Sequence, residues 1–279
     1  MKILQDEDLS KYTSVRIGGT AKTMYFPESR DELIDLIKHH DTPVFISGGS
    51  NLLINNREFE TVINLKSVDS SLEHLGGGRF RAGASVHLQK LINTINKNGY
   101  GGIEYLFSVP GLVGGAIVMN AGRGKTHKKC ISDYIISVDA IRDGAPITLE
   151  KESCGFDYRT SVFKNSNMIV TSVLFKFPEM SAEETAQAKN DRIALCREKQ
   201  DNSRPNFGSV FMESSPLIMR LARSLKIGGK RVHFSGKTTN WILNEGEGTF
   251  QDALNAIQKV ERMHKLLGQR CRREVIVIE

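Results

Sequence analysis

The sequence has few cysteines and no long apolar run. The four cysteines lie far apart and form neither a C-x-x-C pair nor a zinc-like Cys/His spacing, so we expect reduced thiols and no metal site. No stretch approaches the roughly 20 apolar residues that cross a bilayer. The first residues, MKILQDEDLSKY, lack the apolar run of a signal peptide. We therefore expect a cytoplasmic protein without a membrane partner.

A basic block with interleaved aromatic residues is also missing. Lys and Arg number 38 and Asp and Glu number 32, which gives a formal charge of +6. This modest excess suits an anionic small molecule at least as well as a nucleic acid. We expect no nucleic-acid partner. The 279 residues leave room for two or three compact domains.

The pattern of predicted secondary structure changes near residue 180. Before it, glycine turns separate short β-like runs, at 42–47, 61–64, 134–141 and 168–177, and apolar spacing predicts helices at 30–39 and 86–97. After it, we expect helices at 182–199, from Ser215-Pro216 through Leu217, Leu221 and Leu225, and at 250–267, followed by a strand at 274–278. Gly268 stands where a C′ glycine belongs.

The first segment with chemical potential is FISGGSNLL, at residues 45–53. A strand leads into Gly48-Gly49-Ser50-Asn51, where bare backbone N–H groups could converge on an anion. A tight turn between two strands explains the glycines equally well. The segment is neither a Walker A loop nor a G-x-G-x-x-G motif that opens a helix. A nucleotide bound here would use another fold.

The second segment is SVPGLVGGA, at residues 108–116, which leads to Met119-Asn120-Ala121-Gly122. Pro110 restricts φ, while Gly111, Gly114 and Gly115 keep the main chain bare. Because a structural turn rarely needs so many glycines in an apolar setting, this segment favours a ligand site for a flat or charged group.

Six motifs in order resemble one enzyme family over nearly the whole chain. VRIGGTA, GGSNLL, VPGLVGGAIVMNAG, FDYRTSVF, RPNFGSVF and RREVIVIE are similar to those of the UDP-N-acetylenolpyruvoylglucosamine reductases, also called UDP-N-acetylmuramate dehydrogenases. These enzymes belong to peptidoglycan synthesis and cell wall biogenesis. In their reaction a hydride passes from NADPH through FAD to the enolpyruvyl double bond of a UDP-sugar.

The resemblance implies an α+β protein with a vanillyl-alcohol-oxidase-type FAD-binding fold. Two α+β subdomains within 1–180, split near 66, would hold non-covalent FAD, and a C-terminal α+β domain, 181–279, would hold the substrate. The implied cofactor-binding residues are Ser47, Gly48, Gly49, Ser50, Asn51, Leu52, Val109, Pro110, Gly111, Val113, Gly114, Gly115, Ala116, Asn120, Gly122 and Ile169.

Three residues match the catalytic positions of the family. Arg159 would hold the substrate carboxylate and the developing enolate, because its planar fork suits both. Ser209 would donate the proton to carbon, and Glu274 would act with Arg159 as an acid or stabiliser. Outside these motifs, each would read as an ordinary surface or turn residue.

The chain departs from the family in the expected substrate pocket. Arg123-Gly124-Lys125, followed by His127, Lys128 and Lys129, replaces the usual Ala-Tyr-Gly, and Met212-Glu213-Ser214 replaces Lys-Asn-Pro. Near a diphosphate, Glu213 would need a compensating cation, which the basic run could supply. This run could equally be a solvated loop. The candidate substrate-binding residues are Tyr158, Arg123, Lys125, Glu213 and Asn240.

Four functions stay open at this point. The chain could be the peptidoglycan reductase, or a paralogue with the same flavin chemistry on another enol ether or specialised metabolite. It could be a flavin-linked oxidase, for which rapid reoxidation of the flavin by oxygen would argue, or a flavin-binding protein without catalysis. The retained Arg159, Ser209 and Glu274 favour the two reductases.

Overall fold

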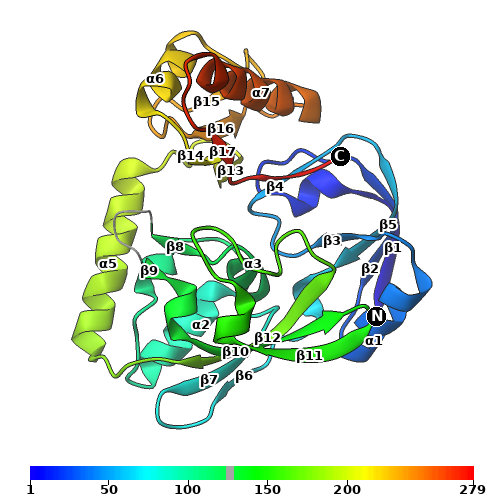
Figure 1. The fold of residues 1–279 in the computed structure, drawn as a ribbon, viewed down its shortest axis with the longest axis vertical. Coiled ribbons are helices and arrows are strands. Elements are labelled where there is room, and N and C mark those ends of the chain that lie inside the picture. Colours follow the sequence, from blue (N-terminus) through cyan, green and yellow to red (C-terminus); the bar gives the residue numbers. More distant parts are fainter. Residues whose placement is uncertain (124–128) are drawn as a thin grey trace. The chain divides into compact units, whose positions relative to one another are not determined.

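A computed structural model of the chain describes residues 1–123 and 129–279, which form two compact units (Figure 1). The first unit contains residues 1–4, 24–48 and 61–196, and the second contains 5–23, 49–60 and 197–279. The units alternate along the chain because three strands run from one into the other. These strands are β1 (Lys2–Asp8), β2 (Thr20–Phe26) and β5 (Glu58–Asn64), and with β3 (Val44–Ile46) they form a sheet in the order β1-β2-β5-β3.

A five-stranded antiparallel sheet forms the centre of the first unit, in the order β11-β10-β12-β7-β6. Its strands are β6 (Leu72–His74), β7 (Arg79–Gly83), β10 (Ile135–Arg142), β11 (Ala145–Glu150) and β12 (Met168–Lys176). Alternate residues of β7 and β12, such as Phe80 and Phe175, turn to one face. This face packs against α2 (Leu88–Lys97) and α3 (Val113–Val118), and Figure 1 shows both helices beside the sheet.

Two further α-helices, α1 and α5, lie in the described part of the first unit. The α1 helix (Arg30–His39) packs Leu33 and Leu36 against Ile141 and Ile169 of the sheet. The α5 helix (Ala182–Lys199) begins where Ser181 and Glu184 exchange capping bonds of 2.9 and 3.2 Å. Thr185 and Cys196 of α5 are buried, so the first unit continues to residue 196. The predicted assignment of ligands to 1–180 and 181–279 stays a prediction.

The second unit is built around a small antiparallel sheet, in the order β13-β16-β15. Its strands are β13 (Asn206–Ser209), β15 (Val232–Phe234) and β16 (Trp241–Asn244), covered by α6 (Pro216–Ser224) and α7 (Phe250–Leu266). Two short ladders adjoin it: β14 (Phe211–Glu213) pairs with β17 (Arg272–Arg273), and β4 (Leu52–Ile54) lies parallel to β18 (Ile276–Ile278). A third ladder, β8 (Gly122–Arg123) with β9 (Lys129–Cys130), belongs to the first unit.

The helices predicted from apolar spacing are confirmed, with one difference at α6. The buried face of α6 consists of Ile218, Met219 and Ala222, whereas Leu217, Leu221 and Leu225 are exposed by 74, 45 and 62%. Gly268 has a φ of 63° at the end of α7, which confirms its predicted C′ position. Among the described residues, no helix is long and apolar enough to cross a membrane.

Candidate active site

The two glycine-rich segments meet in the first unit. A Cβ on Gly48, which follows β3, would lie only 3.2 Å from the Cα of Gly111. Gly111 itself has a φ of 145°, a conformation that other residues rarely adopt. Both glycines are therefore needed for this close approach. The result is a bare stretch of main chain, as a flat ligand close to the backbone requires.

The two adjacent glycines of α3 have different surroundings. A Cβ on Gly114 would lie 2.9 Å from the Ala84 Cβ, so Gly114 permits the close packing of α3 on the chain after β7. A Cβ on Gly115 would find space instead. Outside its own helix and its chain neighbours, the one described atom within 4 Å would be Ser47 Oγ, at 3.9 Å. The position of Gly115 thus has room beside Ser47, and cofactor binding there stays a prediction.

The remaining cofactor candidates of the first unit lie around these glycines. Val113 and Ala116 are buried in the hydrophobic core, and Ile169 is buried in β12. Val109 is half-buried and Pro110 is exposed, just before Gly111. Their contacts with a cofactor stay predictions.

Gly49 begins the part of the loop that belongs to the second unit. It has a φ of 63°, and a Cβ there would lie 1.8 Å from the backbone oxygen of Tyr12, so the chain itself requires glycine. Beyond half-buried Ser50, the Asn51 side chain donates to the backbone oxygen of Glu274, at 3.1 Å. The Ile276 N–H donates to the Asn51 oxygen, at 3.0 Å, and Leu52 starts β4. The predicted turn role is confirmed for Gly49, and the ligand role stays a prediction.

Arg159 lies in a two-residue hairpin turn of the first unit. Asp157 and Thr160 exchange two backbone hydrogen bonds of 3.2 Å around Tyr158 and Arg159. Arg159 has a φ of 57°, which is rare for a residue with a long side chain and typical of constrained functional positions. Its Nη2 donates to the Gly122 backbone oxygen at 2.8 Å, and this bond orients the guanidinium.

The Asn120-Ala121-Gly122 motif holds this turn. The Asn120 Nδ2 donates to the Asp157 backbone oxygen at 2.9 Å, and its Oδ1 accepts from the Ser132 N–H at 3.3 Å. A Cβ on Gly122 would lie 2.4 Å from the Lys129 oxygen, so only glycine fits there. The groups predicted for cofactor binding are thus engaged with the turn that carries Arg159.

The pKa of the half-buried Cys130 thiol depends on the charges around this turn. Burial raises the pKa of its thiol, and Asp133 raises the pKa further, while the Arg159 guanidinium acts in the opposite direction. Arg159 therefore lies close enough to influence this thiol.

Ser209 and Glu274 come together in the second unit, although 65 positions separate them in the chain. Ser209 ends β13 opposite Trp241. The N–H groups of Glu274 and Val275 both donate to the oxygen of Val210, the residue after Ser209, at 2.8 and 3.3 Å. Both candidate residues are half-buried. The structure therefore brings these two together within one unit and places Arg159 in the other.

Asn240 organises the backbone beside Ser209. Its Oδ1 accepts from the Phe211 N–H at 3.1 Å, and its Nδ2 donates to the Phe211 oxygen at 2.8 Å. The Asn240 backbone oxygen accepts from the Val210 N–H at 2.9 Å. The Asn240 side-chain amide thus bonds the Phe211 backbone as a neighbouring strand would. Its substrate contact stays a prediction.

The other substrate candidates are placed as follows. Glu213 is half-buried in β14 and faces Arg272 in the β14–β17 register, so a cation stands opposite it within its own unit. Tyr158 is in the Arg159 turn, where the guanidinium carbon lies 5.7 Å from its ring centroid. Arg123 is half-buried in β8. Lys125, with His127 and Lys128, lies outside the described residues.

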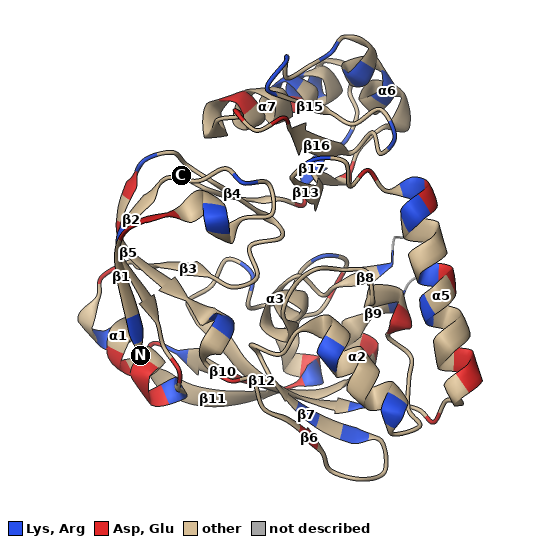
Figure 2. Cartoon of the chain, turned by 180° about the vertical axis from the view of Figure 1, so that it is seen from behind, with Lys and Arg blue, Asp and Glu red and all other residues tan. Residues whose placement is uncertain are grey.

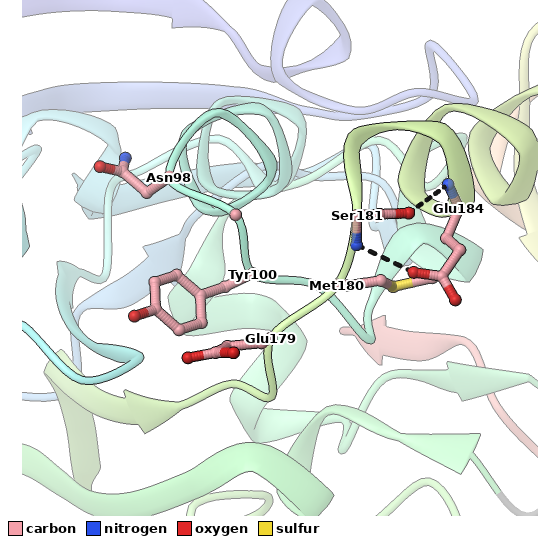
Figure 3. A pocket seen from close by; sticks show the side chains of 7 residues that line it. Asn98, Tyr100, Glu179, Met180, Ser181 and Glu184 are labelled. Atoms are coloured by element: carbon pink, nitrogen blue, oxygen red, sulfur yellow. Dashed lines mark hydrogen bonds between the residues drawn. The ribbon is translucent and has the colours of Figure 1, made fainter.

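A separate open pocket of the first unit lies where α2 ends and α5 begins (Figure 3). Its lining includes Tyr100, Glu179 and Met180, and the capping pair of Ser181 and Glu184 closes one side. None of the predicted site residues described here lines it. Among the described residues, no three His, Cys, Asp or Glu side chains are arranged to hold a metal ion.

Sequence reasoning missed two residues that support the site. The Ser161 hydroxyl donates to the Val118 oxygen at 2.8 Å and so ties the Arg159 turn to α3. Its place in the FDYRTSVF motif was the available signal. His264 is fully buried, with ring nitrogens bonded to the Val260 oxygen and the Ser215 N–H, at 2.8 and 2.9 Å. It positions the start of α6 and has no local sequence signal.

Comparison with protein families identifies relatives of this chain. The model of the family described as FAD binding domain matches residues 21–148. A UDP-N-acetylenolpyruvoylglucosamine reductase from Thermotoga sp. (strain RQ2) is 31% identical over 268 residues, covering 93% of this chain and 87% of that protein. The reductase of the same name from Thermotoga maritima is 32% identical over 269 residues, covering 93% and 92%.

Solved structures show the same fold. The UDP-N-acetylenolpyruvylglucosamine reductase from Thermus caldophilus matches with a TM-score of 0.81 at 24% identity, over 100% of this chain and 98% of that one. The 6-hydroxy-D-nicotine oxidase from Arthrobacter nicotinovorans matches with a TM-score of 0.51 at 17% identity, over 64% and 42%. The predicted α+β fold, with an FAD-binding part of the vanillyl-alcohol-oxidase type, is confirmed.

Proposed function

The chain belongs to the UDP-N-acetylenolpyruvoylglucosamine reductase family, and on that premise we propose that Arg159, Ser209 and Glu274 carry its catalysis. Family membership makes it an FAD-dependent oxidoreductase of peptidoglycan precursor synthesis that uses NADPH. Its substrate is a nucleotide-linked sugar that carries an enolpyruvyl double bond. The observation that carries the residue assignment is the bond between Glu274 and Val210, which places Glu274 beside Ser209.

The bare backbone of the first unit would hold FAD. Gly48 and Gly111 provide the close approach, and the space beside Gly115 and Ser47 fits a ligand that would collide with a Cβ. When bound, FAD supplies the hydride chemistry that no side chain has. Asn120 and Gly122 would contribute indirectly, because their polar groups hold the Arg159 turn.

Arg159 would bind the substrate carboxylate. As a double bond beside a carboxylate takes up a hydride, negative charge grows on the carboxylate oxygens, and a fixed guanidinium stabilises this charge. The bond from Nη2 to the Gly122 oxygen fixes the guanidinium before substrate arrives. A planar guanidinium matches the two oxygens of a carboxylate in geometry and charge.

Ser209 would then donate a proton to the carbon beside the carboxylate. A serine hydroxyl is a weak acid, so its proton transfer needs a neighbouring ionisable group that can change its charge as the proton leaves. Glu274 is the candidate, since its backbone is fixed one residue from Ser209. Ser209 ends β13, and Glu274 lies between β17 and β18 with its N–H bonded to the Val210 oxygen, so the backbone of both is fixed without substrate.

We also propose where the protein works and what it does not bind. The nucleotide-linked substrate and NADPH are small anionic molecules, which suit the modest basic excess without a nucleic-acid partner. The four free cysteines suit a reducing cytoplasm.

Separate measurement of the two half-reactions tests this function. With the enzyme loaded with FAD, NADPH should reduce the flavin of Ser209→Ala nearly as fast as that of the wild type. Reoxidation by the UDP-linked enolpyruvyl sugar should slow by roughly 10²–10⁴-fold, the usual contribution of a positioned acid. Ser203→Ala is the matched control, because Ser203 is exposed in the same unit. Equal damage to both half-reactions would show that Ser209 is structural.

A further inference from the structure

The α6 helix carries an exposed stripe of leucines in addition to its buried face. Leu217, Leu221 and Leu225 follow one another at intervals of four residues, so they lie one above the other on the helix. The buried residues Ile218, Met219 and Ala222 already attach α6 to the core of the second unit. The stripe is therefore not needed for the fold, and it exposes apolar surface to water at a cost.

The same part of the chain holds a concentrated positive charge. Residues 214–244 contain six Lys and Arg and no Asp or Glu, which equals the formal +6 of the whole chain, so the remaining residues are balanced. Figure 2 shows these cations on α6 and the loops that follow it. Arg220, Lys226 and Lys230 are exposed. Arg231 pairs with Asp252 at 3.4 Å, and Arg223 donates to the Gly236 oxygen at 3.0 Å.

We propose that α6 docks on an anionic phospholipid surface. Leucines on one side of a surface helix with Lys and Arg around them are typical of helices that lie in the membrane interface. Four to eight clustered cations on such a helix are typical of binding to anionic lipid headgroups. A lipid surface also needs no complementary shape, which suits a stripe on a convex helix. This contact goes beyond the proposed function, involves no spanning segment, and departs from the expectation of no membrane partner.

Sedimentation with lipid vesicles tests the docking surface. The FAD-loaded full chain should bind vesicles of phosphatidylcholine mixed with phosphatidylglycerol, and bind vesicles of phosphatidylcholine alone at least tenfold less. High salt should weaken the binding, because salt screens the attraction between exposed charges. Each cation near an anionic surface contributes roughly a fivefold change in partitioning. Leu217→Glu with Leu221→Glu should abolish it, and Arg220→Glu should weaken it more than tenfold.

Leu75→Glu is the matched control, because Leu75 is 42% exposed and belongs to the first unit, outside the basic segment. It should bind as the wild type does. All variants should keep the wild-type melting temperature and reductase activity, since none of these side chains is in the core or the candidate active site. Absence of wild-type binding, equal binding to neutral vesicles, or equal loss with Leu75→Glu would overturn the proposal.

Discussion

The turn that carries Arg159 and the backbone that carries Ser209 and Glu274 differ in how the chain fixes them. Arg159 depends on a positive φ and on the Asn120 amide and the Gly122 oxygen. Ser209 and Glu274 are fixed mainly by backbone bonds, such as the two that converge on the Val210 oxygen.

This difference predicts different tolerance to substitution. A backbone ladder survives most side-chain changes, because its bonds do not depend on residue type. The Arg159 turn needs particular side chains, and a buried amide that loses its partner costs about 1–3 kcal/mol. We therefore expect changes around Arg159 to affect the rate of substrate reduction, and comparable changes around Ser209 to affect mainly the stability of the second unit.

Among substitutions in the first unit, the largest effect should come from Arg159 itself. Arg159→Ala should slow reoxidation of the flavin by substrate about 10²–10³-fold, as expected when a charge that stabilises the transition state is removed. Arg159→Lys should recover only part of the loss, since an ammonium cannot match two carboxylate oxygens. Stopped-flow absorbance of the flavin gives the rate. Full recovery in the lysine variant would mean that charge alone matters and that the fixed turn is unnecessary.

A pair of glycines tests the cofactor side of the first unit. Gly115→Ala should lower FAD affinity by about ten- to a hundredfold, because an overpacked contact costs roughly 1–3 kcal/mol. The apoprotein should be no less stable, since alanine favours a helix and meets only Ser47 Oγ at 3.9 Å. Gly114→Ala should show the reverse pattern, with lost stability from the contact with Ala84.

FAD titration and thermal melting of both glycine variants separate these outcomes. Unchanged FAD affinity in Gly115→Ala would place the cofactor elsewhere. It would leave the Arg159 and Ser209 assignments untouched.

Two asparagines give the direct test of the comparison. Asn120→Gly keeps the φ of 41° without strain and removes both side-chain bonds, so substrate reduction should slow about tenfold while FAD stays bound. Asn240→Ala removes two bonds to Phe211 but leaves the backbone bonds at Val210. It should lower the melting temperature with less than a threefold effect on rate. Similar rate losses in both variants would contradict the contrast between turn and ladder.

Local features of the fold were predictable, because their causes are local. The bounds of α1 and α5 agree with the predicted 30–39 and 182–199, since Ser29 and Ser181 cap the first turns. The motifs named Ser209 and Glu274 together, and the backbone bonds at Val210 bring these two residues close, while their catalytic roles stay predictions. The bonds of Asn120 to Asp157 and of Asn240 to Phe211 were not predictable, because they join residues 37 and 29 positions apart. The exposure of the α6 leucines likewise depends on how a whole helix packs.

The smallest expected effect is on the pKa of the Cys130 thiol. Measuring it tests, in solution, whether the Arg159 guanidinium lies near this thiol. Arg159 lowers the pKa of this thiol against the opposing effects of burial and Asp133. Arg159→Ala should therefore raise the pKa, reduce the thiolate fraction at a given pH, and slow alkylation of Cys130 by iodoacetamide. Peptide mass spectrometry follows the alkylation of Cys130 separately from that of Cys271. Burial raises the pKa of Cys271 to about 11, and Arg159 does not contribute to this shift. The rate profile of Cys130 should shift to higher pH, while that of Cys271 stays in place.

If Asn120 holds the turn, Asn120→Gly should shift the profile of Cys130 in the same direction by a smaller amount, because the guanidinium moves without being lost. An unchanged Cys130 profile in Arg159→Ala would show that the guanidinium points away from the β8–β9 ladder, and the bond to Gly122 would then no longer explain its orientation.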